Sequence, residues 1–157
     1  MDNSELFEKA NKLYTTGNYQ EAIEAYIKIL KKTPNKVSLY TNLAVSYVQL
    51  QKYSKAEETF FSGLRIGKSD TSLYKNLALM YFSVGDIEAS IRVLQVGIKR
   101  VPRSAALNSL LGDCYRRLDK IDEAITFYKK SIEIEPKNFD AYMGLCWLYQ
   151  EKSEFKQ

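Results

Sequence analysis

The chain has 157 residues, of which 45% are hydrophobic, and it carries a formal net charge of +4 without a histidine. This length and composition suffice for one domain with a continuous core, and the modest charge does not favour nucleic acid as a partner. No apolar run is long enough to cross a membrane and the polar start is unlike a signal peptide, so the sequence predicts a cytoplasmic protein without a membrane partner.

The first two predicted helices cover residues 3–16 and 19–33. Gly17 is expected to end the first helix, because glycine adopts the left-handed conformation common at helix ends, and Asn18 is expected to cap the second. Lysines close the second helix, where they favour the negative end of the helix dipole. The chain therefore begins with a helical hairpin.

Another predicted helix ends near residue 67, and the junction that follows it lacks a proline. Gly67 is expected to end that helix in a left-handed conformation, and Ser69 and Asp70 are expected to cap the next one. Gly63 lies inside this helix, where a glycine costs about 1 kcal/mol relative to alanine, so we expect a neighbouring helix to approach closely there. Later in the chain, Asp122 is expected to be the N-cap of the second helix of a hairpin at residues 105–138.

The C-terminal stretch FDAYMGLCWLY, residues 139–149, is apolar almost all round. A terminal helix of a stacked array should have a polar outer side, which this one lacks. The sequence therefore predicts that further repeats or another domain follow in a longer parent protein, or that this end pairs with another molecule. The candidate assembly surface consists of Met143, Trp147 and Leu148.

A 34-residue repeat organises these helices. The repeats run at residues 3–36, 37–70, 71–104 and 105–138 without insertion or deletion, and a fifth begins at residue 139. Small residues allow two helices to approach and bulky ones fill the gap at the next level, so this alternation reflects packing. The eighth place of each repeat is always small (Ala10, Ala44, Ala78, Gly112, Cys146), and the twenty-fourth is large (Tyr26, Phe60, Leu94, Tyr128).

The pattern resembles the tetratricopeptide repeat family, whose large, small and aromatic places recur with the same period. The resemblance is clearest in Tyr40, Leu43, Ala44, Tyr47, Ala56 and Phe60, and it covers nearly the whole chain. It implies an all-α fold, a right-handed superhelical solenoid of antiparallel helix pairs forming a single domain over residues 1–157. Such a fold is a scaffold and does not by itself specify a function.

The sequence predicts no catalytic, cofactor or metal site. Histidine is absent, no glycine-rich phosphate loop occurs, and Cys114 and Cys146 lack a CxxC partner. Both cysteines occupy internal-facing places and are expected to be small packing residues. Asp113 with Arg116 forms the nearest thing to a polar cluster, for which an ion pair along one helix is the simplest interpretation. The protein is therefore predicted not to be an enzyme.

The family resemblance implies a ligand site, because in this family the first helix of each repeat lines a concave groove that holds an extended peptide. Carried onto this sequence, the ligand-facing places of the fifth repeat include Met143 and Trp147. Those of the first four repeats include Asn11, Asn42, Val45, Val48, Gln49, Lys75, Asn76, Leu79, Phe82, Asp113, Arg116 and Arg117.

Two features of this predicted groove favour peptide binding. Val45, Val48, Leu79 and Phe82 form an apolar strip, and two asparagines, Asn42 and Asn76, occupy matching places from which amides could pair with a peptide backbone. Two alternatives stay open: the asparagines are ordinary surface residues, or a helix of the parent chain covers the strip.

The family's chaperone-binding members hold an acidic peptide terminus with two asparagines and three basic residues. Asn11 and Asn42 match those asparagines, but Phe7, Ser72 and Asn76 stand where the basic residues belong. Chaperone-tail binding is therefore not favoured, although Arg116 and Arg117 could receive an acidic ligand residue.

The sequence thus predicts a protein–protein interaction module that binds an extended peptide or a helix of a partner in its groove. One alternative is an assembly or regulatory segment of a larger enzyme or complex. Another is self-association through the apolar C-terminal helix.

Overall fold

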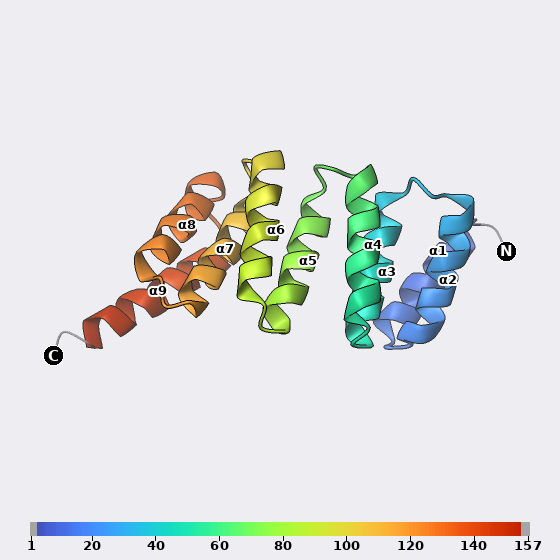
Figure 1. Cartoon of the computed structure of the whole chain (residues 1–157), viewed down its shortest axis with the longest axis horizontal. Coiled ribbons are helices and arrows are strands. Elements are labelled where there is room, and N and C mark those ends of the chain that lie inside the picture. The colour runs from blue at the N-terminus through green and yellow to red at the C-terminus, as the bar shows by residue number, and fades with distance from the viewer. Residues whose placement is uncertain (1–2, 155–157) are drawn as a thin grey trace. The chain divides into compact units, whose positions relative to one another are not determined.

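The computed structural model describes the backbone of residues 3–154 and the side chains of residues 3–150 (Figure 1). Within these residues every regular element is an α-helix, which confirms the predicted all-α fold. The nine helices are α1 (Asn3–Thr15), α2 (Tyr19–Lys32), α3 (Val37–Gln49), α4 (Tyr53–Ile66), α5 (Thr71–Ser83), α6 (Ile87–Arg100), α7 (Ala105–Arg117), α8 (Ile121–Ile134) and α9 (Phe139–Glu154).

The contacts among the helices define two compact units, and the boundary falls inside α5. Unit 1 is Met1–Asn76 and unit 2 is Leu77–Gln157. Each repeat supplies a pair of antiparallel helices joined by a short turn, and α9 is the first helix of the fifth repeat. The expectation of one domain over residues 1–157 stays a prediction.

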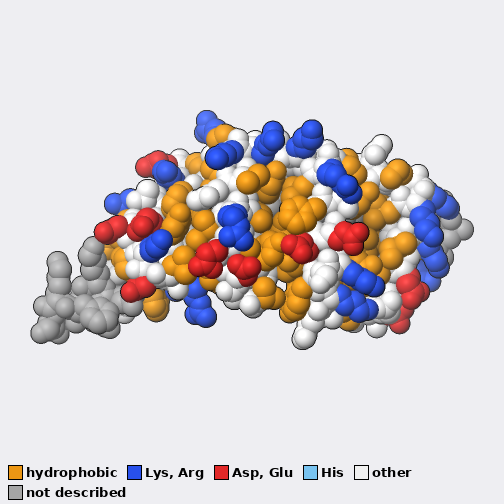
Figure 2. All heavy atoms as spheres, viewed as in Figure 1, with side chains coloured by type: hydrophobic (Ala, Val, Ile, Leu, Met, Phe, Trp, Pro, Cys, Tyr) orange, Lys and Arg blue, Asp and Glu red, His pale blue; other side chains and the backbone are white. Residues whose placement is uncertain are grey.

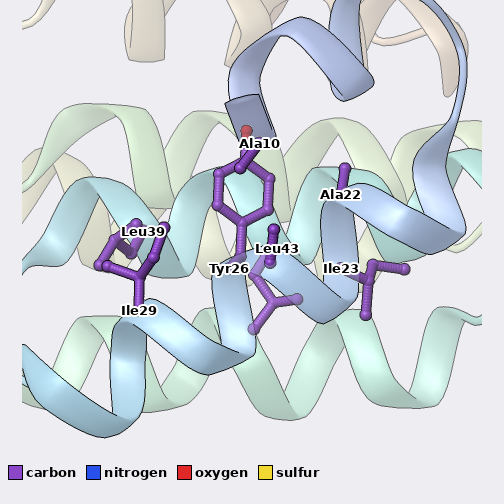
Figure 3. Packing of buried hydrophobic residues seen from close by; sticks show 8 residues of the cluster. Ala10, Ala22, Ile23, Tyr26, Ile29, Leu39 and Leu43 are labelled. Atoms are coloured by element: carbon purple, nitrogen blue, oxygen red, sulfur yellow. The ribbon is translucent and has the colours of Figure 1, made fainter. Parts of the chain in front are cut away.

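The core of unit 1 forms around Tyr26, whose side chain is completely buried. Figure 3 shows the Tyr26 side chain at the centre of the cluster, with Ala10, Ala22 and Leu43 around it. The small eighth-place residue Ala10 thus lies against the large twenty-fourth-place residue of its own repeat, as the packing interpretation predicts.

In unit 2 the equivalent tyrosine is held between two glycines. A methyl group at Gly112 on α7 would lie 2.8 Å from Cδ1 of Tyr128, and one at Gly144 on α9 would lie 2.7 Å from its Cε1. Both distances are shorter than carbon atoms tolerate, so the Tyr128 ring occupies space that any larger residue would need. Ala124, Ala141 and Leu148 complete this buried cluster, which α7, α8 and α9 form together.

Two residues of the fifth repeat do not lie where the sequence suggested. Leu148, predicted as part of an assembly surface, is only 1% exposed. It occupies the tenth place, which faces the second helix of the preceding repeat, just as the tenth-place Cys114 faces Ser90 on α6. Cys146 is exposed instead of internal. Its eighth place faces the second helix of its own repeat, as Gly112 faces Tyr128, and no described helix fills that role for α9.

The predicted helix ends are partly right. Gly17 has a positive φ of 81°, as expected, and the Asp70 carboxylate accepts a hydrogen bond from the Leu73 amide at 3.0 Å. Asn18 is the N-cap residue of α2, but its side chain makes no capping bond. Instead, its amide nitrogen donates to Thr16 Oγ1 at 3.1 Å.

One prediction about helix ends is half right and another is wrong. Gly67 is the C-cap of α4, as predicted, but its φ is −100° and not left-handed; its small size also serves packing, because a methyl group there would lie 2.7 Å from Val37 Cγ1. The N-cap of α8 is Lys120, which makes no side-chain capping bond, and Asp122 lies in the first turn. Gly63 behaves as predicted, since a methyl group there would lie 2.8 Å from Cβ of Tyr40 on α3. None of the described helices combines the length and apolarity that crossing a membrane requires.

Candidate functional site

A tyrosine hydroxyl from the second helix reaches the ninth place of the first helix in two repeats. Tyr26 donates a hydrogen bond to Asn11 Oδ1 at 2.8 Å in unit 1. Tyr128 donates to Asp113 Oδ1 at 2.7 Å in unit 2. In both pairs the ring is buried and its hydroxyl points to a half-buried acceptor at a place that the resemblance predicts to face a ligand.

The two middle repeats replace both partners of this bond by apolar residues. Phe60 and Leu94 stand at the tyrosine place, and Val45 and Leu79 stand at the acceptor place. A buried donor or acceptor left without a partner costs about 1–3 kcal/mol, which favours having hydroxyl and acceptor present or absent together.

In unit 1 the asparagines predicted to face a ligand bind each other. Asn42 Nδ2 on α3 donates to Asn11 Oδ1 on α1 at 3.2 Å, so this one oxygen accepts from both Asn42 and Tyr26. Asn76 is held differently, because its Nδ2 donates to the carbonyl of Ser72 in its own helix at 2.8 Å. The two asparagines at matching places therefore present their amides in different ways.

The remaining predicted groove residues vary in exposure. Val45 and Val48 are half-buried in unit 1, and Gln49 and Lys75 are exposed. In unit 2, Leu79 is 40% exposed, Phe82 is half-buried and Arg117 is exposed. Whether the residues of the two units form one continuous strip stays a prediction.

Unit 2 contains a cavity of about 380 Å³ between α7 and α9. Gly144 lines it, and the place of its missing side chain is occupied by the Tyr128 ring. In the second repeat the same sixth place carries Asn42, whose side chain bonds Asn11, whereas Gly144 has no side chain that could bond Asp113. The cavity is lined by Asp113, Arg116, Asp140, Met143, Gly144 and Trp147.

The charged groups of this cavity interact with each other and with the tryptophan. Arg116 Nη2 lies 3.7 Å from Asp113 Oδ1, and the Arg116 guanidinium carbon lies 5.0 Å from the centre of the Trp147 ring. Burial raises the pKa of Asp113, and the nearby charge of Asp140 raises it further, whereas the Tyr128 hydroxyl and Arg116 oppose the shift. Burial and the Asp113 carboxylate also raise the pKa of Tyr128, so its hydroxyl stays a donor.

Two further observations concern groups that metal binding or nucleophilic chemistry would use. Among the side chains that the structure describes, no three His, Cys, Asp or Glu residues gather as a metal ion would require. Burial raises the pKa of the Cys114 thiol to about 11, so this cysteine is a poor nucleophile. On the face shown in Figure 2, basic, acidic and hydrophobic side chains are interspersed over the described residues.

Four of the six cavity residues are among those predicted from the sequence, and Asp140 and Gly144 are not. Tyr26 and Tyr128 are predicted there only as core residues. One signal was present, because the two repeats with tyrosine at the twenty-fourth place are those with Asn or Asp at the ninth. Nothing in the sequence indicated a cavity beside Gly144, because its sixth place is also compatible with a filled helix contact.

The chain belongs to the tetratricopeptide repeat family. Models of this family match residues 13–80 and 105–138. RNA polymerase II-associated protein 3 of Mus musculus is 27% identical over 136 residues, which are 87% of this chain and 16% of that protein. Tetratricopeptide repeat protein 12 of Homo sapiens is 42% identical over 50 residues, 32% of this chain and 7% of the relative. The chain thus spans a small part of the curated relatives that it matches.

Solved structures have the same fold. The MamA protein is 27% identical with a TM-score of 0.75, covering 96% of this chain and 82% of MamA. A thermophilic TPR protein of Thermus thermophilus is 20% identical with a TM-score of 0.78, covering 96% of this chain and 82% of that protein. YrrB, a TPR protein with an unusual peptide-binding site, is 21% identical with a TM-score of 0.67, covering 97% of this chain and 78% of YrrB.

Proposed function

We propose that this chain is a non-enzymatic interaction module that binds an extended segment of a partner protein along the first helices of its repeats. The observation that carries the proposal is the cavity of unit 2, since Asp113, Arg116, Met143 and Trp147 line it from ligand-facing places of the family. Ligand pockets commonly have volumes of about 300–1,000 Å³, and this open pocket with three charged lining residues lies at the lower end of that range. A cytoplasmic location is part of this proposal.

The exposed apolar residues at equivalent places support the same function. Leu79 is 40% exposed. Removing apolar surface from water is favourable by about 25 cal/mol of free energy for each Å². An apolar ligand side chain would cover it. In unit 1, Asn11 keeps its amide nitrogen as a donor after its oxygen has accepted two bonds. YrrB has the same fold and an unusual peptide-binding site, which supports the proposal.

The proposal is tested with a substitution on a first helix and a matched one on a second helix. Peptides selected by phage display on the wild-type chain are measured by fluorescence anisotropy against Leu79→Glu and Val96→Glu. Val96 lies on α6 and is 50% exposed, so both variants place the same charge at similar exposure. We expect Leu79→Glu to weaken binding about ten-fold or more and Val96→Glu to change it less than about two-fold. Equal effects, with both variants folded by circular dichroism, would place binding elsewhere.

Self-association through α9 is a second candidate, which a specific observation favours. Tyr142 and Tyr149 are 46% and 49% exposed, and Cys146 is exposed, whereas the same places of α7 are buried or half-buried. This face of α9 would fit a further helix. Association between copies would be supported if the mass measured by light scattering rises with concentration for the wild type but remains that of a monomer for Tyr142→Lys.

The greater length of the curated relatives favours the other alternative, a segment of a larger assembly.

A further inference from the structure

We propose that the cavity of unit 2 binds one basic side chain, lysine or arginine, of the partner segment. The inference rests on the proposed function and adds the chemical class of the residue that this part of the site receives. It is carried by the charges and the apolar walls of the cavity.

The cavity has an excess of negative charge. Two carboxylates, Asp113 and Asp140, line it together with a single guanidinium, that of Arg116. Arg116 is already engaged by the Asp113 carboxylate at 3.7 Å and by the Trp147 ring at 5.0 Å. Asp140 is exposed in the first turn of α9. A ligand cation beside Asp140 would therefore be attracted by this carboxylate, which Arg116 does not balance, without displacing the arginine from Asp113.

An acidic ligand would meet the opposite situation. It would approach two carboxylates, and to bind Arg116 it would have to compete with Asp113 for the same guanidinium. Because Asp113 is only about a third exposed, loss of its cation would leave a half-buried charge with the Tyr128 hydroxyl alone, which is unfavourable. The geometry therefore selects against a carboxylate in this cavity.

The walls suit the aliphatic part of a basic side chain. Met143 and Trp147 are 54% and 53% exposed, and both line the cavity. Lysine and arginine carry a stem of methylene groups that packs on such a surface while the charged end stays near polar groups. The apolar walls and the carboxylates are therefore suited to the two halves of one basic side chain.

The test uses single-residue probes and a reporter inside the cavity. Trp147 is the only tryptophan, so its indole N–H gives one resonance in a ¹H–¹⁵N spectrum. Nα-acetyl-lysine amide is titrated against Nα-acetyl-norleucine amide, which has the stem without the charge, and Nα-acetyl-glutamate amide. We expect the lysine probe to shift the indole resonance with a Kd on the order of millimolar. The norleucine probe should bind about five-fold more weakly, and the glutamate probe should leave the resonance in place.

A variant pair separates the cavity from the general charge. Asp140→Asn should weaken the lysine probe about five-fold. Glu133→Gln makes the same charge change at an exposed place on α8 outside the cavity and should leave the affinity unchanged. Equal effects of the two variants, stronger binding of the glutamate probe, or no shift with any probe at about 50 mM would overturn the proposal. These outcomes leave the proposed function intact if the selected peptides still discriminate Leu79→Glu from Val96→Glu.

Discussion

We call the packing of α1, α2 and α3 around Tyr26 the first junction and the packing of α7, α8 and α9 around Tyr128 the last junction. Both bury a tyrosine ring from the same place of the repeat, but the groups around its hydroxyl differ. Around Tyr26 the hydroxyl, an asparagine acceptor and the Asn42 side chain form a neutral network. Around Tyr128 the hydroxyl is kept, but the acceptor is Asp113 and the place of Asn42 is taken by Gly144. The two repeats therefore keep the same hydrogen bond, but the neutral network of the first is replaced by a charged acceptor that lines a cavity in the last.

The largest expected effect comes from filling the place of Gly144. In Gly144→Ala the new methyl group would lie 2.7 Å from Tyr128 Cε1, against a ring that is completely buried. We expect a loss of about 2–3 kcal/mol in the free energy of unfolding, measured with urea, because overpacking of a filled site cannot relax freely. Asn42→Ala, at the matching place of unit 1, should lose only the one hydrogen bond, about 1 kcal/mol. Equal losses would mean that the two junctions pack alike.

A charge introduced into the first junction should also destabilise. Asn11→Asp places a half-buried carboxylate beside Tyr26 and Asn42, and Tyr14 occupies the place of Arg116 in that repeat. We expect a loss of about 1–2 kcal/mol in the urea unfolding free energy at neutral pH. Asn18→Asp, the same change at an exposed N-cap, should be neutral or stabilising. A loss in Asn18→Asp as large as that in Asn11→Asp would show that burial is not the cause.

Removing the two hydroxyls compares the acceptors directly. Tyr128→Phe leaves the Asp113 carboxylate with Arg116 at 3.7 Å and should lose about 1–2 kcal/mol, because hydrogen bonds to charged groups are the stronger ones. Tyr26→Phe leaves Asn11 with the Asn42 amide and should lose at most about 1 kcal/mol. Thermal unfolding of both variants measures the difference, and a larger loss for Tyr26→Phe would contradict the role assigned to the charge.

The smallest effect is expected for Asp113→Asn, which gives the last junction the acceptor of the first. Because the pKa of Asp113 is raised above its ordinary value of 3.8 in the folded state, the native protein holds this proton more tightly than the unfolded chain. The Asp113 contribution to stability therefore falls as the pH rises from the ordinary pKa of 3.8 to the raised pKa of the folded state. At pH 7 we expect the variant to lie within about 1 kcal/mol of the wild type. When the urea midpoints of the two proteins are compared from about pH 7 down to pH 4, the wild type should become progressively more stable than the variant. A difference between the two proteins that does not vary with pH would contradict this coupling.

Sequence alone determined the helices, because the 34-residue period places small and large residues at fixed points of each hairpin. The first helix was predicted at residues 3–16 and ends at Thr15, and the second was predicted at residues 19–33 and ends at Lys32. The eighth-place rule also held for Ala10, which packs on Tyr26. These features depend on contacts within one hairpin, which recur in each repeat and are therefore visible in the sequence.

Only the tertiary structure decided features that depend on which helix covers a given place. Leu148 is buried because the preceding repeat covers its tenth place, and Cys146 is exposed because its eighth place faces no described helix. Gly67 ends α4 as predicted, but only the tertiary structure shows that the neighbouring Val37 also requires its small size. The cavity between α7 and α9 has the same origin. Its lining comes from two repeats, and the Tyr128 ring of α8 occupies the place of a side chain at Gly144, so no single repeat carries that information.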